Sequence, residues 1–425
     1  MNSELQTLVS KLHMIRQTID HMTDIIATHM SKNVSEAPAK FRDASLKFHE
    51  SLTKEERHAE GIYFTPREIR ARLFAILDSL ALRPSRILEP SFGTGEFILD
   101  ASVRYPDAQV TGVEKNKGLF ASLPSLSSEG RTLINNDFLA YKSDSVFDLV
   151  IGNPPYFVVK DKNPACMTGR GNIFVQFIYK CLVEHMIEGG ILAFVLPTSF
   201  YNCSYYRPCR DYMRSNCQIL HVENVAGDFY DTSQETMIMV VRKTAPLNAN
   251  YWYTFGGGLY LTPFYKELAA LTTGAGTLCG LGFQVKTGDV VWNQHKKKLH
   301  ATEGTLVIYS SNIVNNTLVL ENLLGKEKKQ RIKGYEGMPV EGPAILVARG
   351  YGNTYRFAYT MVPEGTRFHG ENHVNVITPL TSDAKALLPR VMNSLGDPRT
   401  EKFISMFVGN GAMSKSELES VLPIF

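Results

Sequence analysis

Residues 148–157 read Asp-Leu-Val-Ile-Gly-Asn-Pro-Pro-Tyr-Phe, and the rest of the chain is best understood from this stretch. The apolar run at 149–151 predicts a buried central strand. Gly152 and the prolines end that strand, because proline cannot donate a ladder hydrogen bond and fixes its own φ. The sequence therefore predicts an α/β sheet with a stiff loop at the carboxyl end of a strand, where such sheets bind ligands.

The loop itself, Asn153-Pro154-Pro155-Tyr156, offers a specific set of contacts. The Asn153 side-chain oxygen and the Pro154 carbonyl can both accept hydrogen bonds from one exocyclic NH2 group. Tyr156 has a flat face that can stack on a planar ring, and the prolines hold the acceptors still. Such a site suits an aromatic or amide amine that must become nucleophilic without being deprotonated. The alternative is a Pro-Pro turn that merely ends a strand.

A glycine turn follows an earlier strand-like piece. Residues 86–98 read Arg-Ile-Leu-Glu-Pro-Ser-Phe-Gly-Thr-Gly-Glu-Phe-Ile. Gly93 and Gly95 allow positive φ and a close approach of the backbone to a ligand. The dinucleotide fingerprint would need a third glycine where Ile98 stands, which disfavours NAD and fits the looser turn of methyltransferases.

Three strand-like pieces in this half of the chain end in an acid: Glu89, followed by Pro90, then Glu114, then Asp137. Glu114 comes about twenty residues after the glycine turn, where an acid hydrogen-bonds ribose hydroxyls in doubly wound nucleotide folds. One such acid is usually a solvated turn residue. Three in order, followed by Asn153, indicate a binding site.

The order of these motifs resembles the gamma class of DNA adenine-N6 methyltransferases, in which Asn-Pro-Pro-Tyr marks the N6-adenine enzymes. The similarity continues through a helix expected at 172–179, a glycine turn and buried strand at 189–200, and a stretch at 229–242 that resembles the family's eighth motif. The resemblance implies a Rossmann-like S-adenosylmethionine-dependent methyltransferase sheet. It also implies a second aromatic wall for the base, Phe229, with Tyr230 as the alternative.

The resemblance gives the candidate residues their roles. Thr65, expected as the N-cap of a helix with Pro66 in its first position, can face the methionine carboxylate. Glu89 can face the cationic methionine moiety, and Asp137 and Phe138 the adenine. The predicted cofactor residues are Thr65, Glu89, Pro90, Gly93, Gly95, Glu114, Asp137, Phe138 and Asn153. The predicted catalytic residues are Asn153, Pro154, Pro155, Tyr156 and Phe229.

Composition limits the class of protein. The chain has 425 residues, 44% hydrophobic and 20% charged, with a net charge of +3. This length favours two domains with an appendage. The cysteines show no zinc spacing and read as reduced thiols, the histidines show no metal spacing, and we propose no metal. Without a signal peptide or a run long enough to span a bilayer, we expect a soluble cytoplasmic protein, with no membrane partner.

We expect three regions: an N-terminal helical segment (1–60), the catalytic domain (61–248), and a separate mixed α+β target-recognition domain (249–425) that binds double-stranded DNA. Apolar residues at heptad spacing over 5–26 predict a helix that packs on its own domain or pairs with a second copy or partner subunit. Two basic runs, at 296–298 and 326–333, can contact phosphates, although such runs are usually solvated loops.

Three other functions use similar motifs. Protein glutamine N5-methyltransferases also carry Asn-Pro-Pro-Tyr, but their catalytic domain normally ends the chain, whereas residues 250–425 follow it here. Methylation of an amino group in ribosomal RNA is possible on the same grounds. The third alternative is a DNA-specificity subunit of a restriction–modification complex. The intact Asn153–Tyr156 motif and glycine turn argue against it, because they favour methyltransferase activity. An enzyme acting on adenine in a duplex must flip the base out.

Overall fold

The computed structural model describes residues 53, 65–123, 126–225, 235–321, 323, 327–349, 357–408 and 413–425. Almost all of the predicted N-terminal helical segment, together with Phe229 and Tyr230, therefore lies outside the described residues. Within them, no helix is long and apolar enough to cross a membrane.

A seven-stranded sheet forms the first half of the described chain, with strand order β3-β2-β1-β4-β5-β7-β6. Strand β7 runs antiparallel to both of its neighbours, and the others are parallel. The predicted central strand is confirmed as β4, which lies in the middle of the order with four consecutive buried residues at its carboxyl end. The strands are β1 (Arg86–Glu89), β2 (Gln109–Glu114), β3 (Arg131–Asn135), β4 (Phe147–Gly152), β5 (Met186–Pro197), β6 (Cys217–Val225) and β7 (Thr236–Lys243).

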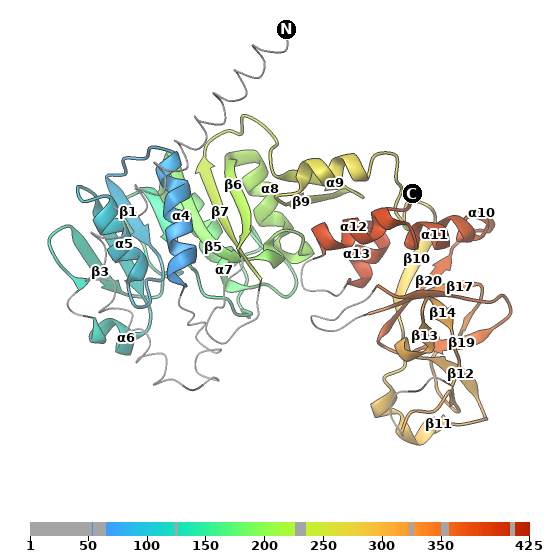
Figure 1. The fold of residues 1–425 in the computed structure, drawn as a ribbon. Helices are drawn as coiled ribbons and strands as arrows, with labels where there is room; N and C mark the ends of the chain where they lie inside the picture. The colour runs from blue at the N-terminus through green and yellow to red at the C-terminus, as the bar shows by residue number, and fades with distance from the viewer. Residues whose placement is uncertain are drawn as a thin grey trace, which may run out of the picture.

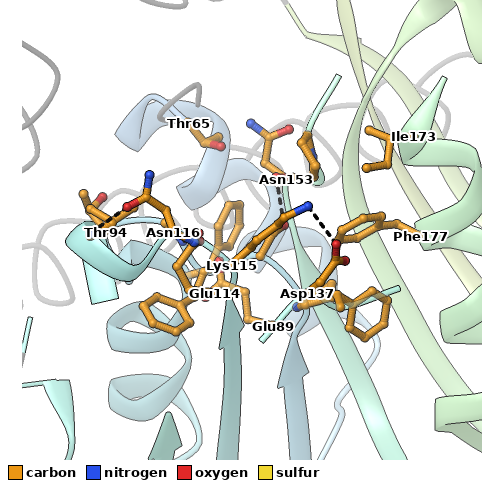
Figure 2. A pocket seen from close by; sticks show the side chains of 18 of the residues that line it. Thr65, Glu89, Thr94, Glu114, Lys115, Asn116, Asp137, Asn153, Ile173 and Phe177 are labelled. Carbon is orange, nitrogen blue, oxygen red and sulfur yellow. Dashed lines mark hydrogen bonds and ion pairs between the residues drawn. The ribbon is translucent and has the colours of Figure 1, made fainter. Parts of the chain in front are cut away.

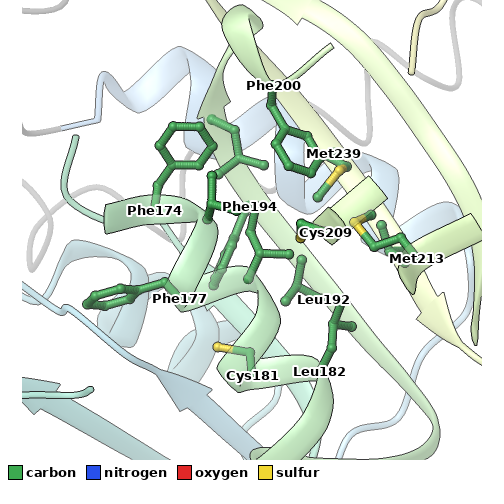
Figure 3. Close-up of a cluster of buried hydrophobic side chains, with 14 of the residues drawn as sticks. Phe174, Phe177, Cys181, Leu182, Leu192, Phe194, Phe200, Cys209, Met213 and Met239 are labelled. Atoms are coloured by element: carbon green, nitrogen blue, oxygen red, sulfur yellow. The ribbon is translucent and has the colours of Figure 1, made fainter. Parts of the chain in front are cut away.

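Helices cover both faces of this sheet because alternate strand residues point to opposite sides. Leu149 and Ile151 pack with the helices of one face, whereas Val150 packs with those of the other. The first face carries α4 (Arg67–Ser79), α5 (Glu96–Arg104) and α6 (Lys117–Ser122) (Figure 1). The second carries α7 (Ile173–Lys180), the π-helix η2 (Cys181–His185) and α8 (Arg207–Asn216), and Figure 3 shows its apolar core. The predicted α/β sheet is thereby confirmed.

One local prediction is wrong. Thr65 is not the N-cap of the first described helix, because α4 begins at Arg67 with Pro66 in the cap position and no side-chain cap bond. The Thr65 carbonyl instead accepts a hydrogen bond from Arg70 at 2.7 Å. Proline fits this boundary because it has no N–H to leave unpaired there.

The second half contains two further sheets, of order β10-β20-β17-β18 and β11-β15-β12-β19-β16. It also contains two hairpins, β8 (Trp252–Phe255) with β9 (Gly258–Leu261) and β13 (Ile313–Val314) with β14 (Thr317–Leu318). Figure 1 shows these sheets beside the seven-stranded one, with α12 (Pro398–Phe407) and α13 (Lys415–Ser420) between. The longer strands are β10 (Phe283–Thr287), β12 (Thr305–Ile308), β17 (Ala344–Ala348), β18 (Tyr359–Val362), β19 (Arg367–Gly370) and β20 (Val374–Pro379). The two-residue strands include β11 (Leu299–His300), β15 (Arg331–Ile332) and β16 (Val340–Glu341), and the other helices include α9 (Tyr265–Leu271), α10 (Ser382–Ala386) and α11 (Leu388–Leu395).

Candidate active site

A cavity of about 530 Å³ lies at the carboxyl ends of β1, β2 and β4. Figure 2 shows Glu89, Glu114 and Asp137 on the strand side of this cavity, with Thr65 and Asn153 across from them. Its volume lies within the range of roughly 300–1,000 Å³ that is usual for small-molecule and cofactor sites.

Most of the predicted site residues meet at this cavity. Those that line it are Thr65, Glu89, Pro90, Gly93, Glu114, Asp137, Phe138, Asn153 and Pro155. Gly95, Pro154 and Tyr156 are close by in the chain but do not line it. The prediction for Phe229 concerns a residue outside the described part of the chain.

The glycine turn has the backbone expected from its sequence. Gly93 and Gly95 have φ values of 53° and 79°. A Cβ on Gly95 would lie 2.3 Å from a methyl group of Leu126, so this position combines left-handed backbone with a close contact. The Gly93 N–H donates to the Glu114 carboxylate at 2.9 Å, which ties the turn to the end of β2.

Glu89 is a buried carboxyl group with an unsatisfied oxygen. It is 2% exposed, and its Oε2 has no hydrogen-bond partner among the described residues. Burial, and then the charge of Glu114, raise its pKa well above the ordinary value. A cationic group in the cavity would supply the missing partner, so the residues present fit the amino and sulfonium charges of S-adenosylmethionine.

The other two strand-end acids are held in place by donors. Glu114 accepts a second hydrogen bond, from the Asn116 N–H at 2.7 Å, and a carboxylate has enough lone pairs to accept from a ligand hydroxyl as well. Asp137 accepts from Lys115 Nζ at 2.8 Å and from the Leu139 N–H at 2.9 Å. These bonds fix the directions of both carboxylates before any ligand binds.

Two aromatic rings border the cavity near Asp137. The rings of Phe138 and Phe177 lie with centroids 4.9 Å apart, and both residues line the cavity. Phe138 is 2% exposed, so its ring is held by packing on the protein side. A planar ligand ring placed here would meet an apolar wall.

Tyr156 holds the loop after β4 in place. The Tyr156 hydroxyl shares its one proton between two acceptors, the Val195 carbonyl of β5 at 2.8 Å and the Asn153 side-chain oxygen. Its ring packs edge-on against Phe174, with centroids 5.9 Å apart. Burial raises the pKa of Tyr156 well above its ordinary value, so the hydroxyl stays protonated. The amide of Asn153 is thus anchored through Tyr156 to the neighbouring strand.

Twelve residues that line the cavity were not predicted as site residues from the sequence: Ser91, Phe92, Thr94, Glu96, Phe97, Lys115, Asn116, Lys117, Leu119, Phe157, Ile173 and Phe177. Arg70, which was also not predicted, supports the site without lining the cavity. Arg70, 4% exposed, binds the Thr65 carbonyl and pairs with Glu96 and Asp100. The sequence signal for Arg70 was a charged residue among the apolar positions of a predicted helix. Lys115 follows Glu114 directly and also lines the cavity, where it pairs with Asp137. No group of potential metal ligands occurs among the described residues.

Comparison with known proteins adds an independent line of evidence. Residues 105–229 match the family model described as Eco57I restriction-modification methylase. The chain is 30% identical to the type II methyltransferase M.CvrRI of Paramecium bursaria Chlorella virus XZ-6E over 393 residues, which covers 91% of this chain and 99% of that protein. It is also 30% identical over 396 residues to the modification methylase CviBIII of Paramecium bursaria Chlorella virus NC1A, with the same coverage.

Solved structures are more distant. One from Listeria monocytogenes, assigned as a class I S-adenosylmethionine-dependent methyltransferase, is 19% identical and has a TM-score of 0.41, covering 49% of this chain and 69% of that one. The sequence relatives, which match almost from end to end, decide the family. The chain belongs to the type II methyltransferases of restriction–modification systems.

Proposed function

We propose that this protein is a site-specific DNA methyltransferase that transfers a methyl group from S-adenosylmethionine to N6 of an adenine flipped out of double-stranded DNA. One observation carries the proposal: Asn153, anchored through Tyr156, lines the same cavity as the buried, unsatisfied carboxyl of Glu89. An acceptor for an amine and a partner for a cation therefore border one space, as amino-group methylation requires.

The residues present can hold the methyl donor in a defined orientation. S-adenosylmethionine supplies an electrophilic methyl group on a positively charged sulfur. Among the residues that line the cavity, Glu89 would offset that charge, Glu114 would accept hydrogen bonds from the ribose hydroxyls, and Asp137 and Phe138 would hold the adenine. The helix-start backbone next to Thr65 suits the methionine carboxylate.

The catalytic loop prepares the target amine. The Asn153 side-chain oxygen and the Pro154 carbonyl accept the two amine hydrogens, which favours a tetrahedral nitrogen with a directed lone pair. A strong general base is not required, because the extra proton leaves the nitrogen after transfer. Tyr156 lies next to the cavity lining and not in it, so the base must reach past Asn153 to stack on its ring. Stacking on Tyr156 and on the predicted Phe229 would contribute roughly 1–3 kcal/mol per aromatic contact and would offset the cost of flipping, a few kcal/mol.

The C-terminal sheets support a duplex substrate through a basic ridge, which we define as Lys296, Lys297, Lys298, Lys328, Lys329, Arg331 and Lys333. Strands β11 and β15 pair, and the Lys333 N–H donates to the Lys298 carbonyl at 2.9 Å, so two runs distant in sequence become adjacent. Lys296 and Lys328 both lie over the Trp292 ring, at 5.5 and 5.4 Å. Clustered cations of this kind suit a phosphate backbone.

Analysis of the methylated product tests the proposal. Purified protein is incubated with S-adenosylmethionine labelled in the methyl group and with genomic DNA, ribosomal RNA or a cell extract depleted of nucleic acid. After digestion of the DNA to nucleosides, we expect the label in N6-methyladenine. Label in N4-methylcytosine, in ribosomal RNA or in protein glutamine would contradict the proposal. DNA binding without any transfer would favour a specificity subunit instead.

A further inference from the structure

The segment that follows the catalytic loop, residues 158–172, begins and ends next to residues that line the cavity. Phe157 and Ile173 both line the cavity, and the Ile173 N–H donates to the Phe157 carbonyl at 3.0 Å. Val158 pairs with Asn172 in an antiparallel bridge, and the Val159 N–H donates to the Gly171 carbonyl at 3.2 Å. Residues 158–172, which we call the rim loop, are therefore closed at their base, and the residues that flank this base line the cavity.

The far end of the rim loop is fixed to the sheet domain. Cys166 and Met167 are buried, and their N–H groups donate to the Asn163 carbonyl at 3.1 Å. The Thr168 N–H donates to the Tyr205 carbonyl at 2.8 Å. A Cβ on Gly169 would lie 2.4 Å from the Tyr205 ring, so the loop packs tightly there. Its exposed side chains consequently project from a supported backbone.

The exposed side of the rim loop is cationic. Lys160, Lys162 and Arg170 are exposed, and Asp161 is the single acid of the loop. Within the described part of the chain, none of these three cations forms an ion pair with a carboxylate. In the basic ridge, by comparison, two of the seven cations are paired, Lys296 with Glu327 and Lys333 with Glu303.

We infer that the rim loop is a second DNA-contact surface, in which Lys160, Lys162 and Arg170 bind backbone phosphates beside the flipped nucleotide. The inference rests on the proposed function. A base inside the cavity stays covalently attached to its strand, so the flanking phosphates must lie near the cavity, which Phe157 and Ile173 at the two ends of this loop help to line. Because these three cations pair with no carboxylate of the described residues, they can bind phosphates without breaking an ion pair to any of those residues, and Arg170 can bind a phosphate bidentately.

The test compares two triple variants that remove equal charge. The rim-loop variant is Lys160→Ala/Lys162→Ala/Arg170→Ala. The control is Arg83→Ala/Arg86→Ala/Lys266→Ala, also exposed, with Arg83 and Arg86 at the amino end of β1, the edge of the sheet opposite the cavity. Binding is measured by fluorescence anisotropy over a range of salt concentrations, with a short duplex cut from DNA that the wild-type enzyme methylates. Donor binding, measured without DNA, checks that each variant keeps its cavity.

We expect the rim-loop variant to bind the duplex at least about tenfold more weakly at moderate salt. Its slope of log K against log salt should shrink by about 0.9 for each phosphate that the variant no longer binds. The control should stay within about twofold of the wild type. Equal affinities and slopes for the two variants would overturn the inference while leaving the proposed function intact. If the wild-type protein methylates no DNA, the proposed function fails first, and the inference fails with it.

Discussion

At the scale of single residues, Tyr156 connects the catalytic loop to the sheet. Its hydroxyl has one proton and lies within hydrogen-bonding reach of two acceptors, the Val195 carbonyl and the Asn153 side chain. Its ring is the surface proposed to stack on the target base. The hydroxyl and the ring therefore have separable roles, one in orienting Asn153 and the other in binding DNA.

Two substitutions at this position separate those roles. Tyr156→Phe removes only the anchor, and we expect kcat to fall by roughly 3- to 10-fold, the equivalent of one net hydrogen bond, with little change in KM for DNA. Tyr156→Ala removes the ring as well and should also weaken DNA binding by about tenfold or more. Steady-state kinetics with each variant measure both quantities. Full kcat in Tyr156→Phe would show that the hydroxyl does not position Asn153.

A second prediction at this scale concerns pH. His185 is 1% exposed, stacks on Tyr141 with centroids 5.6 Å apart, and neither ring nitrogen has a partner among the described residues. Burial, and then the charge of Lys180, lower its pKa from 6.5 to about 4. The unfolded chain thus binds a proton here that the native protein excludes. Stability from this group is complete above pH 6.5 and declines as the pH falls toward 4.

Replacing the imidazole removes that dependence. The gap between the two pKa values corresponds to at most about 3 kcal/mol of unfolding free energy. In His185→Phe, we expect the unfolding free energy from urea titrations to decline less between pH 6.5 and pH 4 than in the wild type. Parallel declines would mean that His185 is protonated in the native protein.

At the scale of elements, the turn between β1 and α5 is the most constrained part of the site. Gly95 has φ of 79° and no room for a Cβ beside Leu126. Gly189, in the glycine turn that leads into the buried part of β5, has a similar φ of 83°, but no atom lies within 4 Å of the place that a Cβ would take. The two glycines have similar left-handed backbone, but only Gly95 would bring an added Cβ into close contact with a neighbour. Substitution of Gly189 is therefore a matched control for substitution of Gly95.

Alanine substitution at each glycine separates the cost of left-handed backbone from the cost of the contact with Leu126. Gly189→Ala should lower the unfolding free energy by about 1–2 kcal/mol, the cost of left-handed backbone for a residue with a side chain. Gly95→Ala should cost about 1–3 kcal/mol more, because overpacking against Leu126 is added. Only Gly95→Ala should weaken binding of the methyl donor. Thermal unfolding and donor titration test this, and equal losses in both variants would contradict the packing argument.

At the scale of the whole molecule, the loop after β5 joins the two halves of the chain. Arg210, 1% exposed, donates to the carbonyls of Phe200, Cys203 and Leu259, at 2.9 to 3.1 Å. Asn202 donates to the Phe407 carbonyl of α12 at 2.9 Å. The segment that follows the strand beside the catalytic loop thus contacts elements of the C-terminal half.

Much of this architecture could be predicted from the sequence, because apolar runs that end in an acid or in Pro-Pro mark parallel strands and their ligand-binding ends. The pairing of β11 with β15 could not, since a two-residue strand has no readable pattern and the basic ridge exists only once they pair. The partners of Arg70 could not be predicted either, because Glu96 and Asp100 lie on another helix. Local propensity misplaced the start of α4 at Thr65: the helix begins at Arg67, and the Thr65 carbonyl accepts a hydrogen bond from Arg70 of the same helix.

The proposed mechanism requires the Asn153 side chain to orient the target amine toward the methyl donor. Turnover of Asn153→Ala on DNA that the wild-type enzyme methylates, with donor affinity measured in parallel, shows whether it does. We predict that methyl transfer falls by at least about 100-fold, comparable to the loss of one oriented polar group in other active sites, while the Kd for S-adenosylmethionine changes by less than about threefold. Normal turnover in Asn153→Ala would refute this role for Asn153 and the mechanism built on it.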